Sequence, residues 1–490
     1  MKKSHVVGYS ALLLLLGSVC SQAQQSLTST RNGDSNAGGQ AVSNVSTTAS
    51  PEQSQFGASG PIVEEQHPAN LPTYTVVYTF TGGADGGVPL ASLIRDMKGN
   101  LYGTTSSGGN DNCSSLAPGC GVVFKVDGAD NETVLYTFTG GADGASPFAD
   151  LTGDAKGNLY GTTESGGSGS AGTVFRLEPP AQPGGTWTET VLHSFCSATN
   201  CADGNTPYAG VIPYEGNLYG TTVGGGEFCI DYGGCGVVFK LDSTGNESVL
   251  YNFCPNGFGS CTDGAFPTGP VIHDAAGNLY GTTQGGGSNG QGTVFKLSPT
   301  GAETWLYSFA GGADGALPTT AGVIQDEAGN LYGTTELGGL SGSGTVFKID
   351  AAGKETVLYS FTGGTDGGLP IASLIRDAKD NLYGTALAGG LASCSCGVVF
   401  KLDQAGKETV LYTFTGGADG SSPYAGLMWG KAAPFTALLG TAEPTPTRHA
   451  KPGDSAVAWC SSSRLNSNDN AGRLPTQANM VEWVAGYFQK

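Results

Sequence analysis

A six-residue motif recurs along this chain at a nearly constant interval and restricts the folds that the chain can adopt. "NLYGTT" begins at Asn100, Asn158, Asn217, Asn278 and Asn330, and "NLYGTA" begins at Asn381. Successive motifs lie 51 to 61 residues apart. A period of this length is typical of repeat proteins, in which each copy is one supersecondary unit that buries its apolar surface against its neighbours.

Within each copy, short apolar stretches alternate with turns rich in glycine and aspartate. In the second copy we expect four short strands, at residues 134–138, 149–153, 159–163 and 173–177. The "DAKGN" stretch between the second and third predicts a hairpin turn, because Gly157 can adopt a positive φ. Four antiparallel strands per repeat predict an all-β protein, a β-propeller. A β-helix or another solenoid is the alternative.

The number of sheets depends on the end of the chain. The pattern "ETVLYTF" occurs seven times in varied form, whereas complete copies number six. We therefore expect six four-stranded blades plus a partial or degenerate seventh. In register, the seventh "LYGTT" falls at residues 435–439, which are Phe-Thr-Ala-Leu-Leu.

The replacement at 435–439 suggests a hypothesis about the gene. Codons for residues 434–439 can be chosen so that the neighbouring reading frame spells Leu-Tyr-Gly-Thr-Thr. The tail would then be an out-of-frame translation of a seventh blade. The alternative is a diverged closing blade followed by a disordered end.

The regions that flank the repeats have different compositions. Residues 1–23 resemble a signal peptide, with Lys2 and Lys3 before an apolar core and small residues before Ala23; a lipoprotein signal ending at Cys20 is the alternative. Residues 24–72 are rich in Ser, Gln, Asn and Gly and predict a flexible linker. The repeats occupy 73–427, and a divergent C-terminal tail occupies 428–490.

Charge and hydropathy limit the partners. The net charge is -19, with a pI near 4.5, which argues against nucleic acid and anionic membranes as partners. No segment after the signal peptide approaches the roughly 20 apolar residues of a membrane span. We therefore expect a monomer that is secreted, or exported to the periplasm or cell surface.

The cysteines fall into close pairs, as expected for local disulfides in an oxidising compartment. The predicted pairs are Cys113 with Cys120, Cys196 with Cys201, Cys229 with Cys235, Cys254 with Cys261 and, at a closer spacing that strains the bridge, Cys394 with Cys396. A zinc site is the alternative, but no pair has CxxC spacing and no histidine lies nearby at ligand spacing.

The repeat unit resembles a known family. Its pattern, "ETVLYSFTGG.DG..P.A.LI.DA.GNLYGTT..GG....GTVFKLD", is similar to the GloVer tandem repeats of exported bacterial "choice-of-anchor" proteins over roughly residues 74–427. The resemblance implies an exported, propeller-like repeat protein whose C-terminus carries a variable sorting or anchoring segment. Residues 428–490 contain neither a hydrophobic anchor nor a basic sorting tail. The family supplies no activity that can be carried over.

Repeated aspartates are the first candidates for chemistry. Seven Asp-Gly turns recur at equivalent positions, at Asp85, Asp143, Asp203, Asp263, Asp314, Asp366 and Asp419. A ring of carboxylates would suit calcium, but Asp in a tight turn also caps its own backbone. We favour the turn role, because symmetry spreads these residues apart. No cofactor is predicted.

Residues that break the repeat pattern are the candidates for catalysis. His193 replaces the tyrosine found at Tyr136, and His273 replaces the arginine found at Arg95. Glu164 and Glu336 directly follow "LYGTT", where a pair of carboxyls would suit a glycosidase. The chain contains no GxSxG, HExxH or phosphate-binding loop.

These observations favour an exported, non-enzymatic propeller that binds a protein or glycan at the cell surface. The loops after "LYGTT", such as 106–121 and 224–236, vary most between copies and are expected to carry specificity. A propeller carbohydrate-active enzyme, glycosidase or lyase, is the alternative. A structural surface or adhesin component is a second alternative.

Overall fold

The computed structural model describes residues 75–110, 113, 119–229, 233–257, 260–430 and 435–436. All of them belong to one compact unit, residues 1–443; a second unit, 444–490, lies outside the described residues. The expected signal peptide, the flexible linker and most of the divergent tail also lie outside them. No helix in the described part of the chain is long and apolar enough to cross a membrane.

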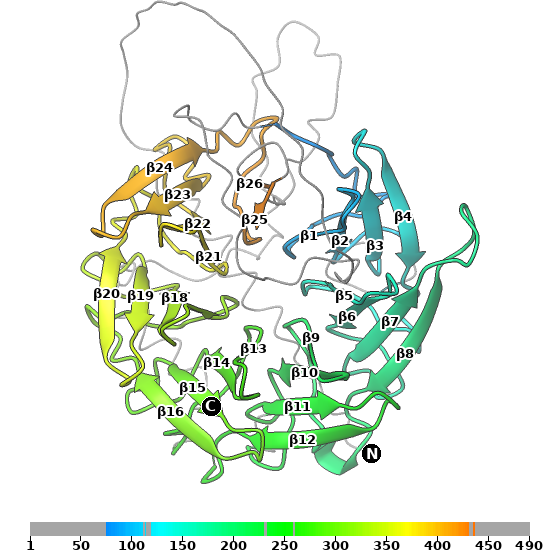
Figure 1. Ribbon diagram of the computed structural model, residues 1–490, viewed down its shortest axis with the longest axis horizontal. Helices are drawn as coiled ribbons and strands as arrows, with labels where there is room; N and C mark the ends of the chain where they lie inside the picture. The colour runs from blue at the N-terminus through cyan, green and yellow to red at the C-terminus, as the bar shows by residue number, and fades with distance from the viewer. Residues whose placement is uncertain are drawn as a thin grey trace, which may run out of the picture. The chain divides into compact units, whose positions relative to one another are not determined.

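Six four-stranded antiparallel sheets follow one another around a ring (Figure 1). Within each sheet the strands lie side by side in chain order, the first nearest the centre of the ring and the fourth outermost. This arrangement confirms the predicted all-β propeller with six complete blades.

The strands have the same lengths in almost every sheet. The first strands are β1 (Ile94–Arg95), β5 (Thr152–Gly153), β9 (Ile212–Tyr214), β13 (Ile272–His273), β17 (Ile324–Gln325) and β21 (Ile375–Arg376). The second strands, which carry the "LYGTT" motif, are β2 (Leu101–Thr105), β6 (Leu159–Thr163), β10 (Asn217–Thr222), β14 (Leu279–Thr283), β18 (Leu331–Thr335) and β22 (Leu382–Ala386).

The outer half of each sheet is equally regular. The third strands are β3 (Val122–Val126), β7 (Thr173–Glu178), β11 (Val237–Leu241), β15 (Thr293–Leu297), β19 (Thr345–Ile349) and β23 (Val398–Leu402). The fourth strands are β4 (Glu132–Thr137), β8 (Thr188–Ser194), β12 (Glu247–Asn252), β16 (Glu303–Ser308), β20 (Glu355–Ser360) and β24 (Glu408–Thr413). A short 3-10 helix, η2 (Thr199–Cys201), follows β8.

The predicted phase of the repeat is wrong by one strand. The strand expected at 134–138 does not open the sheet that contains 159–163. It is β4, and it closes the preceding sheet by pairing with β3. The physical reason is that the turn at 127–131 is short enough to join antiparallel neighbours, whereas the glycine-rich segment 139–151 spans the distance to the next sheet.

The glycine of "LYGTT" is required by packing. A Cβ on Gly161 would lie 2.7 Å from Cζ of Phe175 in the neighbouring strand and 2.9 Å from Cδ2 of Leu151. The equivalent phenylalanine is fully buried in all six sheets. Any larger residue would displace this ring, which explains why the motif keeps glycine at its centre.

Pairs of phenylalanines join adjacent sheets. Phe138, just after β4, packs edge-on against Phe175 of β7, with ring centroids 5.2 Å apart. The same contact recurs around the ring at Phe195–Phe239, Phe253–Phe295, Phe309–Phe347 and Phe361–Phe400. The core is therefore a series of equivalent layers between sheets, as in other repeat proteins.

Both ends of the described chain meet at the first sheet. Phe80 packs on Phe124 with ring centroids 4.8 Å apart, as Phe138 packs on Phe175. Met428 contacts the same apolar cluster, and the Gly426 N–H donates to Ser92 Oγ at 3.1 Å. Residues 75–80 therefore occupy the position of an outer strand that would precede the first sheet.

A two-stranded piece follows the sixth sheet. It consists of β25 (Met428–Trp429) and β26 (Phe435–Thr436). Trp429 lies opposite Phe435, as Arg95 lies opposite Leu101 in the first sheet. Phe435 thus occupies the register position of the "LYGTT" leucine, as predicted. A complete seventh sheet is not present among the described residues.

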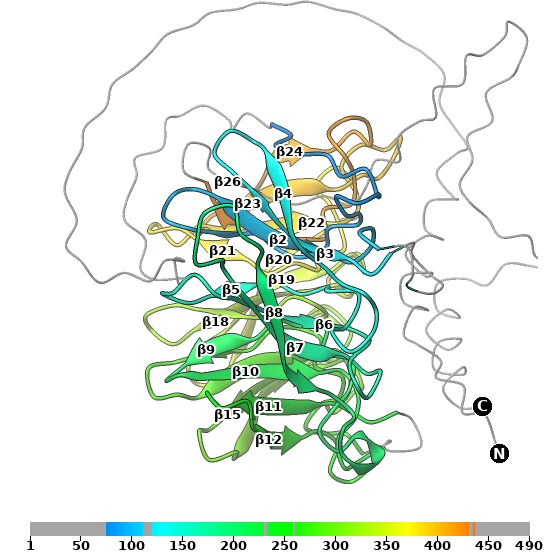
Figure 2. The same ribbon diagram turned by 90° about the vertical axis from the view of Figure 1, so that its right-hand side faces the viewer.

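The connections lie on two opposite faces of the ring, seen from the side in Figure 2. We call one the linker face. It carries the links between sheets and the loops between second and third strands, which pair through bridges such as Ala145–Ser165. The hairpin face carries the turns between first and second strands and those between third and fourth strands.

Candidate functional site

The Asp-Gly turns of the linker face are held by their own hydrogen bonds. Asp143 accepts bonds from the Thr139 N–H at 2.8 Å, the Thr139 hydroxyl at 2.6 Å and the Tyr136 hydroxyl at 3.1 Å. The same tyrosine contact recurs at Asp85, Asp263, Asp314, Asp366 and Asp419. Each carboxylate serves the turn in which it lies, which is the role that we favour over a calcium ring.

Asp203 is the seventh of these aspartates, and His193 stands where the others have tyrosine. His193 Nε2 lies 3.4 Å from Asp203 Oδ2. Burial alone would raise the pKa of Asp203, but the nearby His193 ring and hydrogen bonds from Ser197 and the Ala198 N–H lower it to about 2. His193 lies on the outermost strand β8, away from the centre of the ring.

The hairpin face has a second set of capped turns. Asp154 accepts bonds from the Lys156 N–H, the Asn158 side chain and the Tyr160 hydroxyl, at 2.7 to 3.0 Å. His273 lies at the end of β13 on this face, with its ring 4.4 Å from that of Tyr214. The two candidate histidines therefore lie on different elements, and neither joins the candidate glutamates.

Glu164 and Glu336 belong to a group at the centre of the linker face. Both follow a second strand, β6 and β18 respectively. Tyr208 and Tyr424 lie in the links that lead into β9 and β25. All four side chains are partly exposed. We call these four residues the axial cluster.

Neighbouring charged and polar groups link the members of the axial cluster one to the next. The Tyr208 hydroxyl interacts with Glu164 and with Tyr424, and Tyr424 interacts with Glu336. Tyr208 leads into the third sheet, whereas Tyr424 follows the sixth and Glu336 belongs to the fifth. Charges more than about 10 Å apart are largely screened. Side chains from sheets that are not neighbours can interact in this way only near the axis of the ring.

Burial dominates the protonation of this cluster. It raises the pKa of Glu164 to about 7 and that of Glu336 to about 7. Burial and then Glu336 raise the pKa of Tyr424 to about 12. Both carboxyls therefore exchange protons near neutral pH, and the tyrosines remain hydroxyl donors.

An aromatic surface adjoins Glu164. Phe148 and Tyr208 occupy equivalent positions, each directly after the proline that leads into a first strand. Their rings stack, with centroids 5.0 Å apart and planes inclined by 21°. The equivalent Thr268 is buried, and its hydroxyl has no hydrogen-bond partner within the described ranges.

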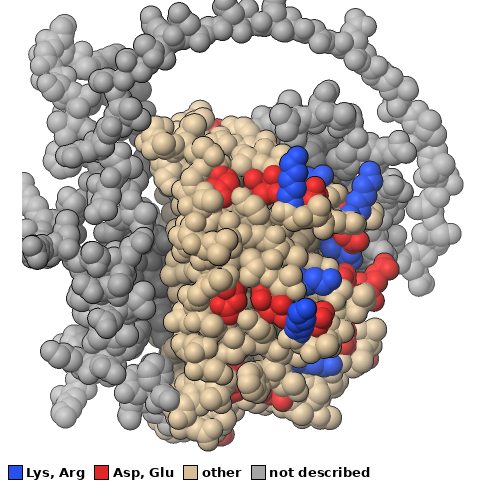
Figure 3. All heavy atoms as spheres, turned by 90° about the vertical axis from the view of Figure 1, so that its left-hand side faces the viewer, with Lys and Arg blue, Asp and Glu red and all other residues tan. Residues whose placement is uncertain are grey.

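The two faces differ in charge. Every Lys and Arg between residues 75 and 430 lies at the end of a first strand, in the second half of a third strand or in a hairpin-face turn. Figure 3 shows these basic side chains gathered toward one side of the visible surface. The links and loops of the linker face contain no Lys or Arg but carry Glu164, Glu336 and the turn aspartates.

All five predicted cysteine pairs are disulfides in the structure. In this oxidised state their sulfur atoms are bonded to each other and are not free to bind zinc. The bonds join Cys113 to Cys120, Cys196 to Cys201, Cys229 to Cys235, Cys254 to Cys261 and Cys394 to Cys396. Each lies in a link or in a loop between second and third strands, so all belong to the linker face.

Two of these disulfides form equivalent contacts at opposite ends of the repeat array. Cys120 and Cys396 are both buried, and each lies against a positive-φ glycine of the link that follows. A Cβ on Gly140 would lie 3.2 Å from Cys120 Sγ, and one on Gly416 would lie 2.7 Å from Cys396 Sγ. The sequence separation of two between Cys394 and Cys396 predicted a strained bridge. The Cys394–Cys396 disulfide nevertheless lies at the position in its repeat that Cys113–Cys120 occupies in the first.

Sequence variation shares the linker face with the disulfides. The variable loops 106–121 and 224–236 lie there, between β2 and β3 and between β10 and β11. The axial cluster lies on the same face. The disulfide-bonded insertions are thus gathered on one side of the ring, whereas the insertion 179–187 between β7 and β8 lies on the hairpin face.

Sequence reasoning found Glu164 and Glu336 but missed Phe148, Tyr208 and Tyr424. A signal was present. The residue after the linker proline is Leu90, Phe148, Tyr208, Thr268, Thr319, Ile371 and Tyr424 in successive copies. This position varies between otherwise uniform neighbours, and variation inside a regular repeat marks a place where packing does not dictate the residue.

The chain is similar to several solved structures at low identity. A luciferin-regenerating enzyme is 12% identical over 65% of this chain and 92% of its own, with a TM-score of 0.37. A protein described as a glucose dehydrogenase from Thermus thermophilus is 16% identical over 61% and 91%, with a TM-score of 0.35. A protein of unknown function from Dyadobacter fermentans DSM 18053 is 11% identical over 74% and 94%, with a TM-score of 0.35. No curated protein matches the chain.

The repeat itself is matched directly. The model of the Gloeobacter/Verrucomicrobia repeat covers residues 59–230 and 231–448, which together include all of the described sheets. The chain therefore belongs to the Gloeobacter/Verrucomicrobia repeat family.

Proposed function

We propose that this protein is a non-enzymatic binding protein that binds a neutral glycan at the axial cluster. The observation that carries the proposal is the partly exposed, stacked pair Phe148 and Tyr208 beside Glu164, on a face without Lys or Arg. Binding sites combine apolar and aromatic surface with a few polar groups that fix orientation.

The chemistry of the cluster favours an uncharged ligand. The partly exposed rings of Phe148 and Tyr208 provide a surface for the C–H face of a sugar ring. Carboxyls with a pKa of about 7 both donate and accept hydrogen bonds at neutral pH. Phosphorylated, sulfated or uronic ligands would meet only acidic groups and are disfavoured.

The two glutamates argue against glycoside hydrolysis. A glycosidase keeps one carboxyl protonated as the acid and the other ionised as nucleophile or base, in environments that separate their pKa values. Here burial is the main influence on both carboxyls and raises the pKa of each, so neither environment favours the ionised form that a nucleophile or base requires. This symmetry suits two equivalent ligand contacts better than a division into acid and nucleophile.

The proposal is tested with a panel of neutral and acidic oligosaccharides, by glycan array and then calorimetry. We expect binding of a neutral glycan without turnover. Tyr208→Ala should weaken it about tenfold or more, since truncating a central aromatic contact costs about 1.4 kcal/mol or more. The matched control is Tyr214→Ala on the hairpin face, which should leave affinity unchanged.

Three outcomes would overturn the proposal. Release of reducing sugar that is abolished by Glu164→Gln or Glu336→Gln would establish the enzyme instead. Equal loss of affinity in Tyr208→Ala and Tyr214→Ala would show that the glycan does not bind specifically at the axial cluster. Binding of a protein with no glycan component would identify a different class of ligand.

Export is part of the proposal. The five disulfides are consistent with an oxidising compartment. A glycan-binding face is useful where glycans are exposed, outside the cell or at its surface. Fractionation of the native host should recover the protein there with its disulfides intact.

A further inference from the structure

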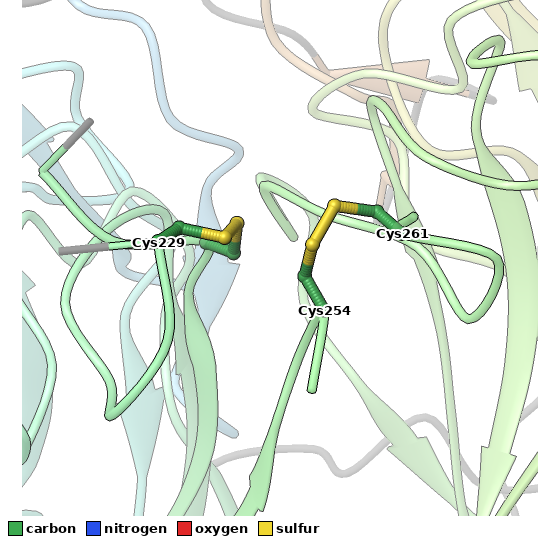
Figure 4. Close-up of side chains that lie close together, drawn as sticks. Cys229, Cys254 and Cys261 are labelled. Carbon is green, nitrogen blue, oxygen red and sulfur yellow. A yellow bond between two sulfur atoms is a disulfide. The ribbon is translucent and has the colours of Figure 1, made fainter. Parts of the chain in front are cut away.

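Two of the five disulfides lie side by side (Figure 4). Cys229–Cys235 belongs to the loop between β10 and β11, and Cys254–Cys261 belongs to the link that follows β12. The four Sγ atoms all lie within 4.8 Å of one another. Within the described ranges, no other group of three or more cysteine, histidine or acidic side chains converges in this way.

The backbone holds each of these cysteines independently of its disulfide. The Gly234 N–H donates to the Cys229 carbonyl at 3.1 Å, and the Phe266 N–H donates to the Cys235 carbonyl at 2.9 Å. The Gly287 N–H donates to the Cys261 carbonyl at 2.7 Å.

Cys254 is held in the same way. Its N–H donates to Asp263 Oδ2 at 2.9 Å, and its carbonyl accepts from the Gly257 N–H at 2.9 Å. These contacts do not involve sulfur, so the four side chains remain near one another when the sulfur–sulfur bonds are broken.

We propose that reduction of both disulfides converts this cluster into a tetrathiolate site for one Zn²⁺. A zinc ion bound to four cysteines has Zn–S distances of about 2.3 Å, which places the sulfurs of a tetrahedron about 3.8 Å apart. The observed limit of 4.8 Å is close to that spacing. Two loops that supply two cysteines each match the four-cysteine composition of structural zinc sites, although the sequence separations of 6 and 7 are longer than the usual spacing.

The conversion balances. Two equivalents of a dithiol or phosphine reductant supply four electrons, the solvent supplies four protons where the reductant does not, and four thiols result. Zn²⁺ binding then displaces four protons and forms four Zn–S bonds. The disulfides close each segment on itself, whereas one Zn²⁺ would join the two segments to each other on the linker face of the third sheet.

Burial favours the metal over solvated thiolates. Cys229, Cys235 and Cys254 are buried, and Cys261 is partly exposed. A buried thiolate without a counterion is unfavourable, whereas coordination neutralises much of its charge. The partly exposed side at Cys261 provides the route for entry of the metal.

The test uses the full chain, reduced with a phosphine, freed of reductant by anaerobic gel filtration and titrated with Co²⁺ as a spectroscopic probe. We expect one equivalent to bind with sulfur-to-cobalt charge transfer and tetrahedral d–d bands, and Zn²⁺ to displace it. The oxidised protein should bind none. Cys229→Ser/Cys235→Ser should abolish the signal.

The matched control is Cys196→Ser/Cys201→Ser, which removes an isolated disulfide on the same face and should keep the full signal. Far-ultraviolet circular dichroism verifies that each variant retains its sheets. Absence of charge transfer in the reduced wild type would overturn the proposal, and so would an unchanged stoichiometry in Cys229→Ser/Cys235→Ser. If that variant unfolds, Cys261→Ser alone provides the same measurement, with a weakened three-sulfur spectrum expected.

Discussion

The hairpin face and the linker face are built from the same repeat, yet they differ in chemistry. On the hairpin face, turns such as Asp154–Asn158 recur with little change, and all Lys and Arg of residues 75–430 lie on or toward it. The linker face has no basic residue and carries the disulfide-bonded insertions and the axial cluster.

Two classes of glutamate make this contrast sharper. Each fourth strand has a glutamate at or near its start, such as Glu189, whose pKa burial and the nearby Asp143 raise to about 7. Glu164 and Glu336 have the same pKa, also because of burial. The first class occurs in all six sheets and the second in only two. A raised pKa therefore does not identify a functional residue in a repeat protein, but a departure from the repeat does.

The largest effects should come from removing turn caps, and they should be equal on the two faces. Asp143→Ala removes three hydrogen bonds on the linker face, and Asp154→Ala removes a similar set on the hairpin face. We expect each to lower the free energy of unfolding by about 1.5–3 kcal/mol, because exposed and partly buried donors lose a charged acceptor. Urea denaturation measures both.

Calcium is the control for this pair. If the aspartates serve only their turns, neither Ca²⁺ nor a chelator should shift the melting temperature of the wild type or of either variant. A stabilisation by Ca²⁺ that disappears in Asp143→Ala but persists in Asp154→Ala would support the alternative hypothesis that the linker-face aspartates bind calcium.

The next effect is a dependence of stability on pH. In the unfolded chain Glu164 and Glu336 titrate near 4.3, whereas in the folded chain their pKa is about 7. The folded state therefore binds more protons between these values. Stability contributed by the two protonated carboxyls is complete below about pH 4.3 and is lost as the pH rises to about 7.

Glu164→Gln/Glu336→Gln should remove that part of the loss. We expect the double variant to be more stable than the wild type at pH 8 by about 1–2 kcal/mol per site and similar at pH 4. Glu178→Gln, a partly exposed partner of Arg176, should leave the profile unchanged. A parallel shift of both variants at every pH would contradict the assigned cause.

The fold could be predicted from the sequence because the same packing contact is specified six times. Six copies of "LYGT" place the same glycine against the same phenylalanine, so period and strand number are visible without coordinates. The assignment of the fourth strand to its sheet could not be predicted. It depends on whether 127–131 or 139–151 is the link between sheets, and both segments contain glycine and aspartate. The hydrogen bonds between β3 and β4 decide it.

Only two of the four residues of the axial cluster could be predicted from the sequence. Glu164 and Glu336 directly follow a conspicuous motif, whereas Tyr208 and Tyr424 lie at a position that varies between copies, and their placement near one another depends on the closed ring. The frame-shift hypothesis for the tail stays a prediction. The register of Phe435 agrees with it, and codons for 434–439 that lack a hidden Leu-Tyr-Gly-Thr-Thr would refute it.

A smaller effect concerns the basic residues of the hairpin face. Lys348 Nζ lies 5.5 Å from the centre of the Tyr332 ring, and Lys296 and Lys401 repeat the contact. Lys348→Met should cost about 0.5–1 kcal/mol, the usual value of a cation–π contact near the surface, without changing ligand affinity. A loss of affinity would mean that the hairpin face contributes to binding; calorimetry alongside thermal melting separates the two results.

The smallest effect should come from restoring the repeat residue at His193. In His193→Tyr, the new hydroxyl can donate to Asp203 as Tyr136 donates to Asp143, so one partner of the carboxylate replaces another. We expect a change in unfolding free energy within about 0.5 kcal/mol, as for substitutions that preserve their contacts, and unchanged ligand affinity. If affinity falls tenfold while stability is kept, the outer strand β8 takes part in ligand binding. The proposal that the ligand contacts only the axial cluster would then be wrong.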